Sequence, residues 1–243
     1  MQFGKKSMVK VSYLGGLGNN LWQYTAGRIL AEKLGAAFDA PPIPDIPNLE
    51  TKINGKRYWL RRKTIQGHFI PDDCAGKLVH IKTGLERYEN IAGRQKDIRS
   101  WINIPKKSEY ELAKQDLVLS VRRGWNNYPV DEKCPSFEYY HQMLTNFNYS
   151  KLYVCTDSPD DKFFEDFRHN LKNTEIVRGD RITQLNVLMS AERLIMAPST
   201  FPFWGGYLGS ASEIYWPKIE GLNFTGKNHD WFPFDDHRHV WVD

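Results

Sequence analysis

The chain has 243 residues, of which 41% are hydrophobic, 14% aromatic and 26% charged. Such a composition is ordinary for a globular protein, and the length allows one large domain or two small ones with a sizeable core. The net charge of +4, from 33 basic and 29 acidic side chains, falls short of the clustered positive charge typical of proteins that bind duplex nucleic acid.

The first predicted elements are a strand, a glycine loop and a helix. Residues 8–14, MVKVSYL, alternate like a strand, and GGLGNN follows as a tight loop. LWQYTAGRILAEKL predicts a helix that Asn19 or Asn20 caps and Gly35 ends. The loop lacks the third glycine of the dinucleotide fingerprint. Its glycines can still admit a ligand close to the backbone, beside the free N–H groups of a helix start; the alternative is a turn that only connects two elements.

Residues 40–110 show weaker patterns. APPIPDIPNL has four prolines in ten residues, which excludes a regular helix interior, and LVHIKTGL predicts short strands. The basic run KRYWLRRK, residues 56–63, predicts a solvated loop or edge strand. The alternative interpretation of this run is a surface for an acceptor or a nucleic acid.

Beyond residue 115, strands alternate with helices. The predicted strands are 117–121, 151–156, 193–198 and 212–217, and the predicted helices are 137–147, 158–171, 180–192 and a helix begun by STFPFWGGYLG. Ser158, Pro159 and Asp161 carry the signature of a helix start. Alternation of this kind indicates parallel βαβ units. We therefore expect an α/β fold with one unit at 1–115 and a second at 116–243.

Polar residues follow three of the predicted strands. Arg122 and Arg123 come directly after strand 117–121, where α/β sheets bind ligands and where a guanidinium can grip a phosphate. Because neighbouring side chains alternate in direction, we expect at most one arginine to contact the phosphate. The alternative is an internal salt bridge.

Two further positions extend this pattern. Asp157 follows strand 151–156, and its carboxylate could accept two hydrogen bonds from guanine or cap the next helix. Ser199 and Thr200 precede a helix start, which suits a diphosphate.

Metal, redox and membrane signals are weak. His237 and His239 with Asp235 and Asp236 have poor metal-ligand spacing, so we expect no metal. The cysteines are widely spaced, which predicts reduced thiols and a cytoplasmic location; they are Cys74, Cys134 and Cys155. No apolar run reaches the length of a membrane span, so we expect no stable membrane insertion.

Three motifs in order resemble the bacterial α-1,2-fucosyltransferases. YLGGLGNNLWQYTAGRILA is similar to their opening GGLGNQ signature, SVRRGW to their HxRRxD motif, and APSTFPFWGGYLG to their C-terminal segment. The resemblance implies a GT-B-like fold, with two Rossmann-like units facing each other across a cleft, the acceptor on the N-terminal unit and the nucleotide sugar on the C-terminal one. The tail from residue 232 is expected to pack back on the N-terminal unit.

The resemblance also implies an inverting, metal-independent enzyme that transfers fucose from GDP-fucose to a galactose-containing acceptor in α-1,2 linkage, without a cofactor. Arg122 would contact the β-phosphate, Arg123 would support that phosphate site or position the reacting groups, and Asp157 would recognise guanine. The remaining donor and cleft residues would be Ser199, Thr200, Phe201, Gly16, Gly18 and the catalytic Asn19. No nucleic acid partner is expected.

The chain departs from the HxRRxD motif at two positions, where Ser120 replaces the histidine and Trp125 the aspartate. Ser120 is nevertheless assigned to the donor site. Asp39 and Asp131 are the candidate general bases, with proton transfer to phosphate or water as the alternative. The departures leave two alternatives open: a different donor or linkage, and a nucleotide-sugar-binding protein without catalysis. The basic run at residues 56–63 and the aromatic residues leave a third, a nucleic-acid-binding module.

Overall fold

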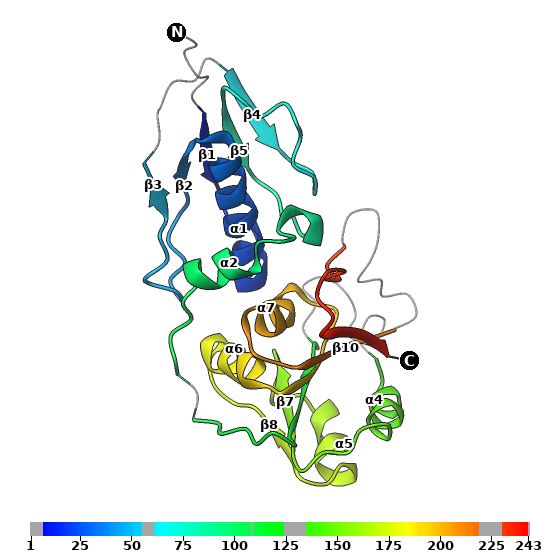
Figure 1. The fold of residues 1–243 in the computed structure, drawn as a ribbon. Coiled ribbons are helices and arrows are strands. Elements are labelled where there is room, and N and C mark those ends of the chain that lie inside the picture. The colour runs from blue at the N-terminus through cyan, green and yellow to red at the C-terminus, as the bar shows by residue number, and fades with distance from the viewer. Residues whose placement is uncertain (1–6, 55–60, 108, 124–134, 219–229, 243) are drawn as a thin grey trace. The chain divides into compact units, whose positions relative to one another are not determined.

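The computed structural model describes residues 7–54, 61–107, 109–123, 135–218 and 230–242. The chain divides into two compact units (Figure 1). The N-terminal unit comprises Met1–Asn103 and Thr225–Asp235, and the C-terminal unit comprises Ile104–Phe224 and Asp236–Asp243. Each unit is an α/β structure around its own sheet.

In the described part of the N-terminal unit, five strands form a sheet in the order β3-β2-β1-β5-β4. Its elements are β1 (Met8–Val11), α1 (Leu17–Leu34), β2 (Ala37–Asp39), β3 (Lys52–Ile53), β4 (Arg61–Ile65), β5 (Lys77–Ile81), the 3-10 helix η1 (Tyr88–Asn90) and α2 (Gln95–Trp101). β1 pairs in parallel with β2 and β5, β4 pairs in parallel with β5, and only β3 runs antiparallel to its neighbour.

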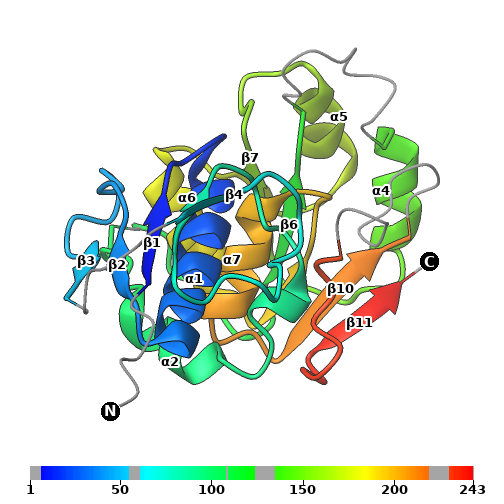
Figure 2. The ribbon, with the colours of Figure 1, turned by 90° about the horizontal axis from the view of Figure 1, so that it is seen from above.

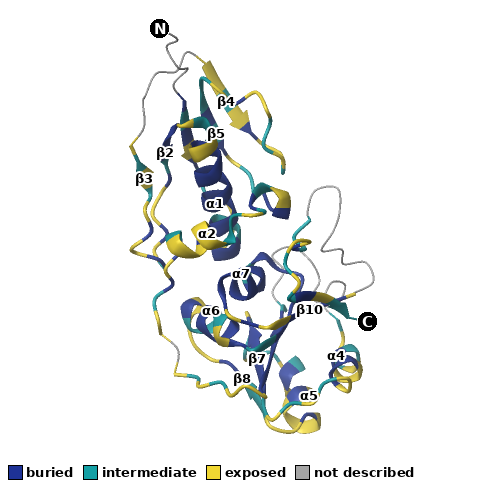
Figure 3. Ribbon diagram, viewed as in Figure 1, coloured by how far each residue is buried: buried dark blue, intermediate teal, exposed yellow. Residues whose placement is uncertain are grey.

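Helix α1 packs closely on one face of this sheet. A Cβ atom added at Gly27 would lie 2.9 Å from Val11 Cγ2 and 3.1 Å from Ile81 Cδ1, so a side chain there would push the helix away. Val9 and Val79 are fully buried on the same face. Buried valine and isoleucine residues alternate with less buried residues along β1 and β5, as expected for strands with one covered face. Figure 3 shows the buried α1 and the largely exposed β4.

In the described part of the C-terminal unit, six parallel strands form a sheet in the order β11-β10-β9-β6-β7-β8. Its elements are β6 (Leu117–Val121), α4 (Phe137–Leu144), β7 (Leu152–Thr156), α5 (Phe163–Asn170), β8 (Thr174–Ile176), α6 (Arg181–Ser190), β9 (Arg193–Ile195), α7 (Thr200–Leu208), β10 (Glu213–Pro217) and β11 (His239–Val242). Figure 2 shows β10 and β11 side by side. Counted from β6, the strands follow the order of a Rossmann sheet: β7 and β8 lie on one side of β6, and β9, β10 and β11 lie on the other. The switch point of this order lies between the parallel strands β6 and β9.

The C-terminal sheet is buried on both faces. Leu119 and Val121 of β6 face a cluster that includes Phe164 and Phe167 of α5, while α6 and α7 contact each other on the other side. A Cβ atom added at Gly205 of α7 would lie 2.4 Å from Leu188 Cβ of α6, so these helices cross at very short range. The largely apolar, fully buried runs LVLSV and LYVCT are typical of strands covered on both sides.

Two predicted helix starts are wrong. Helix α1 begins at Leu17 with Gly16 as its N-cap, so Asn19 and Asn20 lie in its first turn instead of capping it. Burial of the Leu17 side chain, 3% exposed, requires this earlier start. Helix α5 begins at Phe163 instead of Ser158. The Asp161 carboxylate accepts hydrogen bonds from the Phe163 N–H and from Arg123 Nε, which shifts the start along the chain.

In the sequence, the first boundary between the two compact units lies between Asn103 and Ile104, whereas the prediction placed it near residue 115. Residues after Ile104 bind the C-terminal unit: Asn186 Nδ2 donates to the Pro105 carbonyl at 2.8 Å, and the Arg178 N–H donates to Tyr110 Oη at 2.8 Å. Strand β6 begins at Leu117, but the residues from Ile104 onward already belong to the C-terminal unit.

The tail divides between the units. Residues 230–235 cluster with the N-terminal unit, where the Tyr88 N–H donates to the Asp230 carbonyl at 2.6 Å. His239–Val242, in contrast, form β11 of the C-terminal sheet, an element that the sequence did not predict. Among the described residues, no helix is long and apolar enough to cross a membrane.

Candidate functional site

The polar residues predicted at three strand ends are brought together in the C-terminal unit. Arg122, Asp157 and Ser199 follow β6, β7 and β9, which are adjacent parallel strands. Arg122 Nη1 donates to Ser199 Oγ at 2.8 Å, and Arg122 Nε lies 4.0 Å from Asp157 Oδ2. The group thus lies at the carboxyl edge of the sheet, at the point where strand order reverses and where open α/β sheets bind ligands.

Arg122 is held in place without being enclosed. Its side chain is 33% exposed, and that of Asp157 is 42% exposed, so both present surface to a ligand. Asp157 Oδ1 also accepts a hydrogen bond from the Arg123 N–H at 2.9 Å, which ties the ends of β6 and β7 together. A guanidinium fixed in this way offers its charge to an anion with little loss of side-chain entropy on binding.

The start of helix α7 borders the same group. Ser199 is the N-cap: its Oγ accepts from the Phe201 N–H and from Arg122. Ser199 and Thr200 are buried, at 5% and 7% exposure, and Phe201 is half-buried. The N–H groups of a first helical turn and the positive end of the helix dipole favour an anion here. The predicted anion-binding residues Arg122 and Ser199 are therefore neighbours.

Arg123 forms an internal salt bridge, the alternative to a phosphate contact. Its Nε donates to Asp161 Oδ2 at 3.2 Å, its guanidinium lies 4.1 Å from the centre of the Phe163 ring, and its side chain is only 11% exposed. The pKa of Asp161 is lowered, chiefly by the hydrogen bond from the Phe163 N–H against the opposing effect of burial, with Arg123 adding to the lowering. Arg123 thus anchors the loop after β6 to α5.

Ser120 lies inside strand β6, opposite Cys155 of β7, and is 6% exposed. It is the last strand residue but one, and alternation places its side chain on the same side of β6 as that of Arg122. Trp125, Asp131 and Cys134 lie outside the described residues, whereas Cys74 and Cys155 are buried free thiols. Burial raises the pKa of both thiols.

The glycine segment of the N-terminal unit follows β1. Gly15 takes the left-handed conformation at φ 85°, and a Cβ atom there would lie 2.8 Å from Asn19 Nδ2, so the Asn19 side chain folds over this turn. Gly16 is exposed at the N-cap and Gly18 is buried in the first turn. Of the predicted cleft residues, Gly16, Gly18 and Asn19 therefore lie together at the start of α1.

Gln23, which the sequence did not single out, holds this segment in place. Its side chain is fully buried, and its amide both accepts from the Leu14 N–H and donates to the Leu14 carbonyl, each at 2.9 Å. This pair of bonds satisfies two backbone groups that strand pairing leaves unused. The glycine turn is therefore rigid relative to α1.

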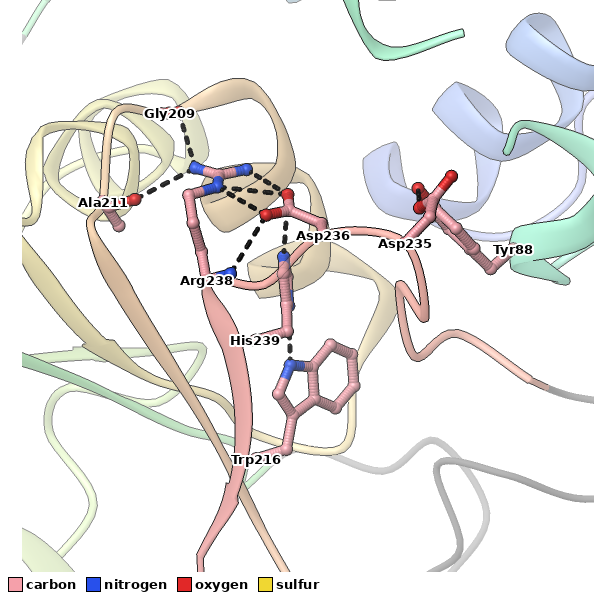
Figure 4. Close-up of polar contacts among 8 residues, drawn as sticks. All are labelled: Tyr88, Gly209, Ala211, Trp216, Asp235, Asp236, Arg238 and His239. Atoms are coloured by element: carbon pink, nitrogen blue, oxygen red, sulfur yellow. Dashed lines mark hydrogen bonds and ion pairs between the residues drawn. The ribbon is translucent and has the colours of Figure 1, made fainter. Parts of the chain in front are cut away.

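Asp236 and His239 form an internal network with Arg238 and Trp216 within the C-terminal unit (Figure 4). Arg238 donates from Nε and Nη2 to the Asp236 carboxylate, and Trp216 Nε1 donates to His239 Nδ1 at 2.8 Å, with His239 Nε2 3.6 Å from Asp236 Oδ2. Burial opposes ionisation of Asp236, but hydrogen bonds from His239 and Arg238 outweigh it and hold its pKa well below the usual range. Asp235 instead faces Tyr88 of the N-terminal unit.

No group of three or more His, Cys, Asp or Glu side chains that could hold a metal ion occurs in the part of the chain that the structure describes. The predicted base Asp39 ends β2, opposite Lys10 of β1. The Lys10 face of this sheet also carries a pair that sequence reasoning missed, Ser12 Oγ and His80 Nε2, 2.7 Å apart. These residues are 68 positions apart, so no local pattern could have found the pair.

Searches of protein-family models and of curated proteins find no match. Among solved structures, the chain is similar to NodZ alpha-1,6-fucosyltransferase co-crystallized with GDP, with a TM-score of 0.54 and 11% identity over 87% of this chain and 94% of that one. The same enzyme soaked with GDP-fucose gives a TM-score of 0.52 at 11% identity, with the same coverage. At this identity the likeness concerns the fold, and it confirms the predicted GT-B-like α/β class.

Proposed function

We propose that the protein is a GDP-fucose-dependent fucosyltransferase that inverts the anomeric carbon and needs no metal ion. One observation carries the proposal: Arg122, Asp157 and Ser199 meet at the switch point of a Rossmann-order sheet, beside the start of α7. The likeness in fold to an enzyme crystallised with GDP and with GDP-fucose supports this choice of donor.

The proposed chemistry places the diphosphate between Arg122 and the start of α7. As the bond between fucose C1 and the β-phosphate oxygen breaks, its electron pair passes to the diphosphate, whose growing charge the Arg122 guanidinium stabilises. The acceptor hydroxyl attacks C1 from the opposite side and gives up its proton. Asp131 or Asp39 would take the proton, or else the departing phosphate or water would do so.

The remaining residues have supporting roles in this proposal. Asp157, 42% exposed, would accept hydrogen bonds from guanine, and Thr200 and Phe201 would contact the diphosphate and nucleoside. Arg123 would position Asp157 through its own N–H. Gly16, Gly18 and Asn19 would contribute on the acceptor side.

The proposed acceptor is a galactose-containing glycan, joined in α-1,2 linkage. The three sequence motifs support this linkage, whereas the structural neighbours are α-1,6 enzymes. Linkage can be read directly from the product by NMR after incubation with GDP-fucose and a galactoside. An α-1,6 product would reject the proposed linkage and keep the proposed donor.

The donor is tested first by thermal shift with GDP, UDP, ADP and CMP at equal concentration. A nucleotide present at 100 to 1,000 times its dissociation constant should add roughly 3–4 kcal/mol of stability, and we expect this only for GDP. A shift with UDP or CMP alone would exclude fucose as the donor sugar. Selective GDP binding with no turnover of GDP-fucose on a panel of galactosides would favour a binding protein without catalysis.

A further inference from the structure

The N-terminal sheet has a second face, opposite α1. Register and alternation place the same-facing residues of its strands together: Lys10 of β1 lies beside His80 of β5 and Asp39 of β2, His80 lies beside Thr64 of β4, and Asp39 faces Lys52 of β3. Arg62 and Lys82 belong to this face by alternation along β4 and β5. We call this surface, defined by these residues and Ser12, the open face.

The open face carries an excess of positive charge. Lys10, Lys52, Arg62 and Lys82 are all exposed, and Asp39 is the carboxylate among its strand residues. The charges of Lys82, Lys10 and Arg62 all reach His80, whose pKa is lowered first by burial and then by these three cations. In the described part of the chain these three cations form no ion pair. On the opposite face, by contrast, Asp73 pairs with both Lys63 and Lys77.

The cations are spread across the sheet. They lie on β3, β1, β4 and the end of β5, so they cover roughly 20 Å at the usual strand spacing of about 4.8 Å. A single phosphate or carboxylate could contact only one or two of them. Their spacing therefore suits an extended chain that carries several negative charges.

Neutral hydrogen-bonding groups lie between the cations. Ser12 and His80 form their pair here, and the exposed Thr64 hydroxyl is the neighbour of His80 on β4. Such groups match sugar hydroxyls. The large apolar side chains that are exposed in the described residues lie elsewhere, namely Leu14, Phe69, Phe234 and Val240. Met8 of β1 and Leu78 of β5 are apolar residues of this face, but they are only partly exposed. The face thus lacks the large exposed apolar anchors typical of a surface that inserts into a lipid layer.

We propose that the open face binds an acidic glycan, and that the acceptor of the transfer reaction is a polysaccharide or oligosaccharide carrying carboxylate or phosphate groups. The identification of this glycan as the acceptor rests on the proposed function. The cations hold the acidic groups, while the hydroxyl and imidazole groups between them bind the sugar. Lys10, Arg62 and Lys82 then select the acceptor without contacting the reacting atoms.

The test measures binding of oligogalacturonate, an acidic probe, and of an uncharged galacto-oligosaccharide of equal length. We expect oligogalacturonate to bind more tightly and to weaken as salt rises, because exposed charges are screened. The double variant Lys10→Gln/Arg62→Gln should lower its affinity about tenfold, as expected when charge-assisted bonds are lost. Arg61→Gln is the matched control, because Arg61 is an exposed arginine on the opposite face of the same strand.

Several outcomes would overturn the inference. These are equal binding of the neutral and acidic probes, an equal effect of the Arg61→Gln control, tighter binding to phosphatidylglycerol vesicles, or tighter binding to a DNA oligonucleotide. GDP affinity is measured on the same samples to separate the two proposals. If the unmodified protein binds GDP but not oligogalacturonate, only the open-face proposal is rejected. If it binds oligogalacturonate but not GDP, only the proposed donor is rejected.

Discussion

The two sheets of this protein differ in how many of their faces are covered, and the pattern of polar and apolar residues along their strands reflects this difference. In β6 and β7 all residues are buried, and apart from Ser120 and Thr156 the runs are largely apolar. In β1 and β5 buried valine and isoleucine alternate with lysine and histidine. A sheet covered on both faces leaves only its edges for ligands, whereas a sheet covered on one face leaves a broad surface as well.

The same contrast separates the two candidate binding regions. At the carboxyl edge of the C-terminal sheet, a few side chains are fixed by one another, as Arg122 is by Ser199. On the open face of the N-terminal sheet, Lys10, Arg62 and Lys82 form no ion pair with any residue that the structure describes. The first arrangement suits one small, highly charged ligand, and the second suits an extended one.

The largest expected effect tests whether the covered sheet holds the donor. Arg122→Ala should lower the turnover of GDP-fucose by about 10²–10³-fold, because it removes a fixed charge from the departing diphosphate. The melting temperature should change little, since the side chain is 33% exposed. Arg178→Ala is the control, because Arg178 follows β8 at the sheet edge away from the switch point. Near-normal turnover in Arg122→Ala would reject its assigned role.

Stability should respond to helix packing in both units, and more strongly in the C-terminal one. Gly205→Ala places a methyl group 2.4 Å from Leu188 Cβ, whereas Gly27→Ala meets side-chain tips at 2.9–3.2 Å. Overpacking typically costs about 1–3 kcal/mol, and we expect Gly205→Ala at the upper end and Gly27→Ala at the lower. Urea unfolding measures both. Gly67→Ala is the control and should leave the unfolding free energy unchanged, because nothing lies within 4 Å of the added Cβ. A larger loss of unfolding free energy in Gly27→Ala than in Gly205→Ala would contradict the expected order.

Two helix caps within the C-terminal unit separate stability from binding. Ser199 and Ser136 cap α7 and α4, but only Ser199 also accepts from Arg122. Replacing either by alanine should cost about 1 kcal/mol of unfolding free energy. Only Ser199→Ala should also weaken GDP binding, which titration calorimetry can measure. Equal GDP affinity in the two variants would mean that the bond to Arg122 does not position the guanidinium.

A further expected effect concerns the acid stability of the C-terminal unit. Because the pKa of Asp236 is depressed below its ordinary 3.8, its ionised form stabilises the fold above that pH, and this contribution is lost as the pH falls below it. Asp236→Asn should therefore lower the melting temperature at neutral pH. The difference in melting temperature between the variant and the unmodified protein should become smaller near pH 3. A gap that is constant with pH would show that the ionised carboxylate is not the stabilising form.

The sequence predicts an element well where local residues determine it, and poorly where contacts between distant residues determine it. Strand 117–121 was predicted with its observed bounds, because a fully buried strand carries its signal in its own five residues. The helix starts at Leu17 and Phe163 were missed, because burial of Leu17 and the bonds of Asp161 decide them. Strand β11 exists only through its pairing with β10.

The candidate site follows the same rule. Arg122, Asp157 and Ser199 could be placed at one edge, because strand ends are visible in sequence and parallel strands align them. That Arg123 turns to Asp161 could not be predicted, since it depends on how the loop after β6 meets α5. The pairs Gln23–Leu14 and Ser12–His80 are likewise products of tertiary structure.

The late position of β11 has a consequence for biosynthesis. Since β11 follows residues 230–235, which belong to the N-terminal unit, neither unit is a continuous stretch of chain. The N-terminal unit is complete only after residues 230–235 have left the ribosome, and the C-terminal unit only after β11 has followed them, so the N-terminal unit cannot finish folding before most of the C-terminal unit has been synthesised. Nascent chains that end before Asp230 should remain protease-sensitive in both halves, and the N-terminal half should become resistant no later than the C-terminal half.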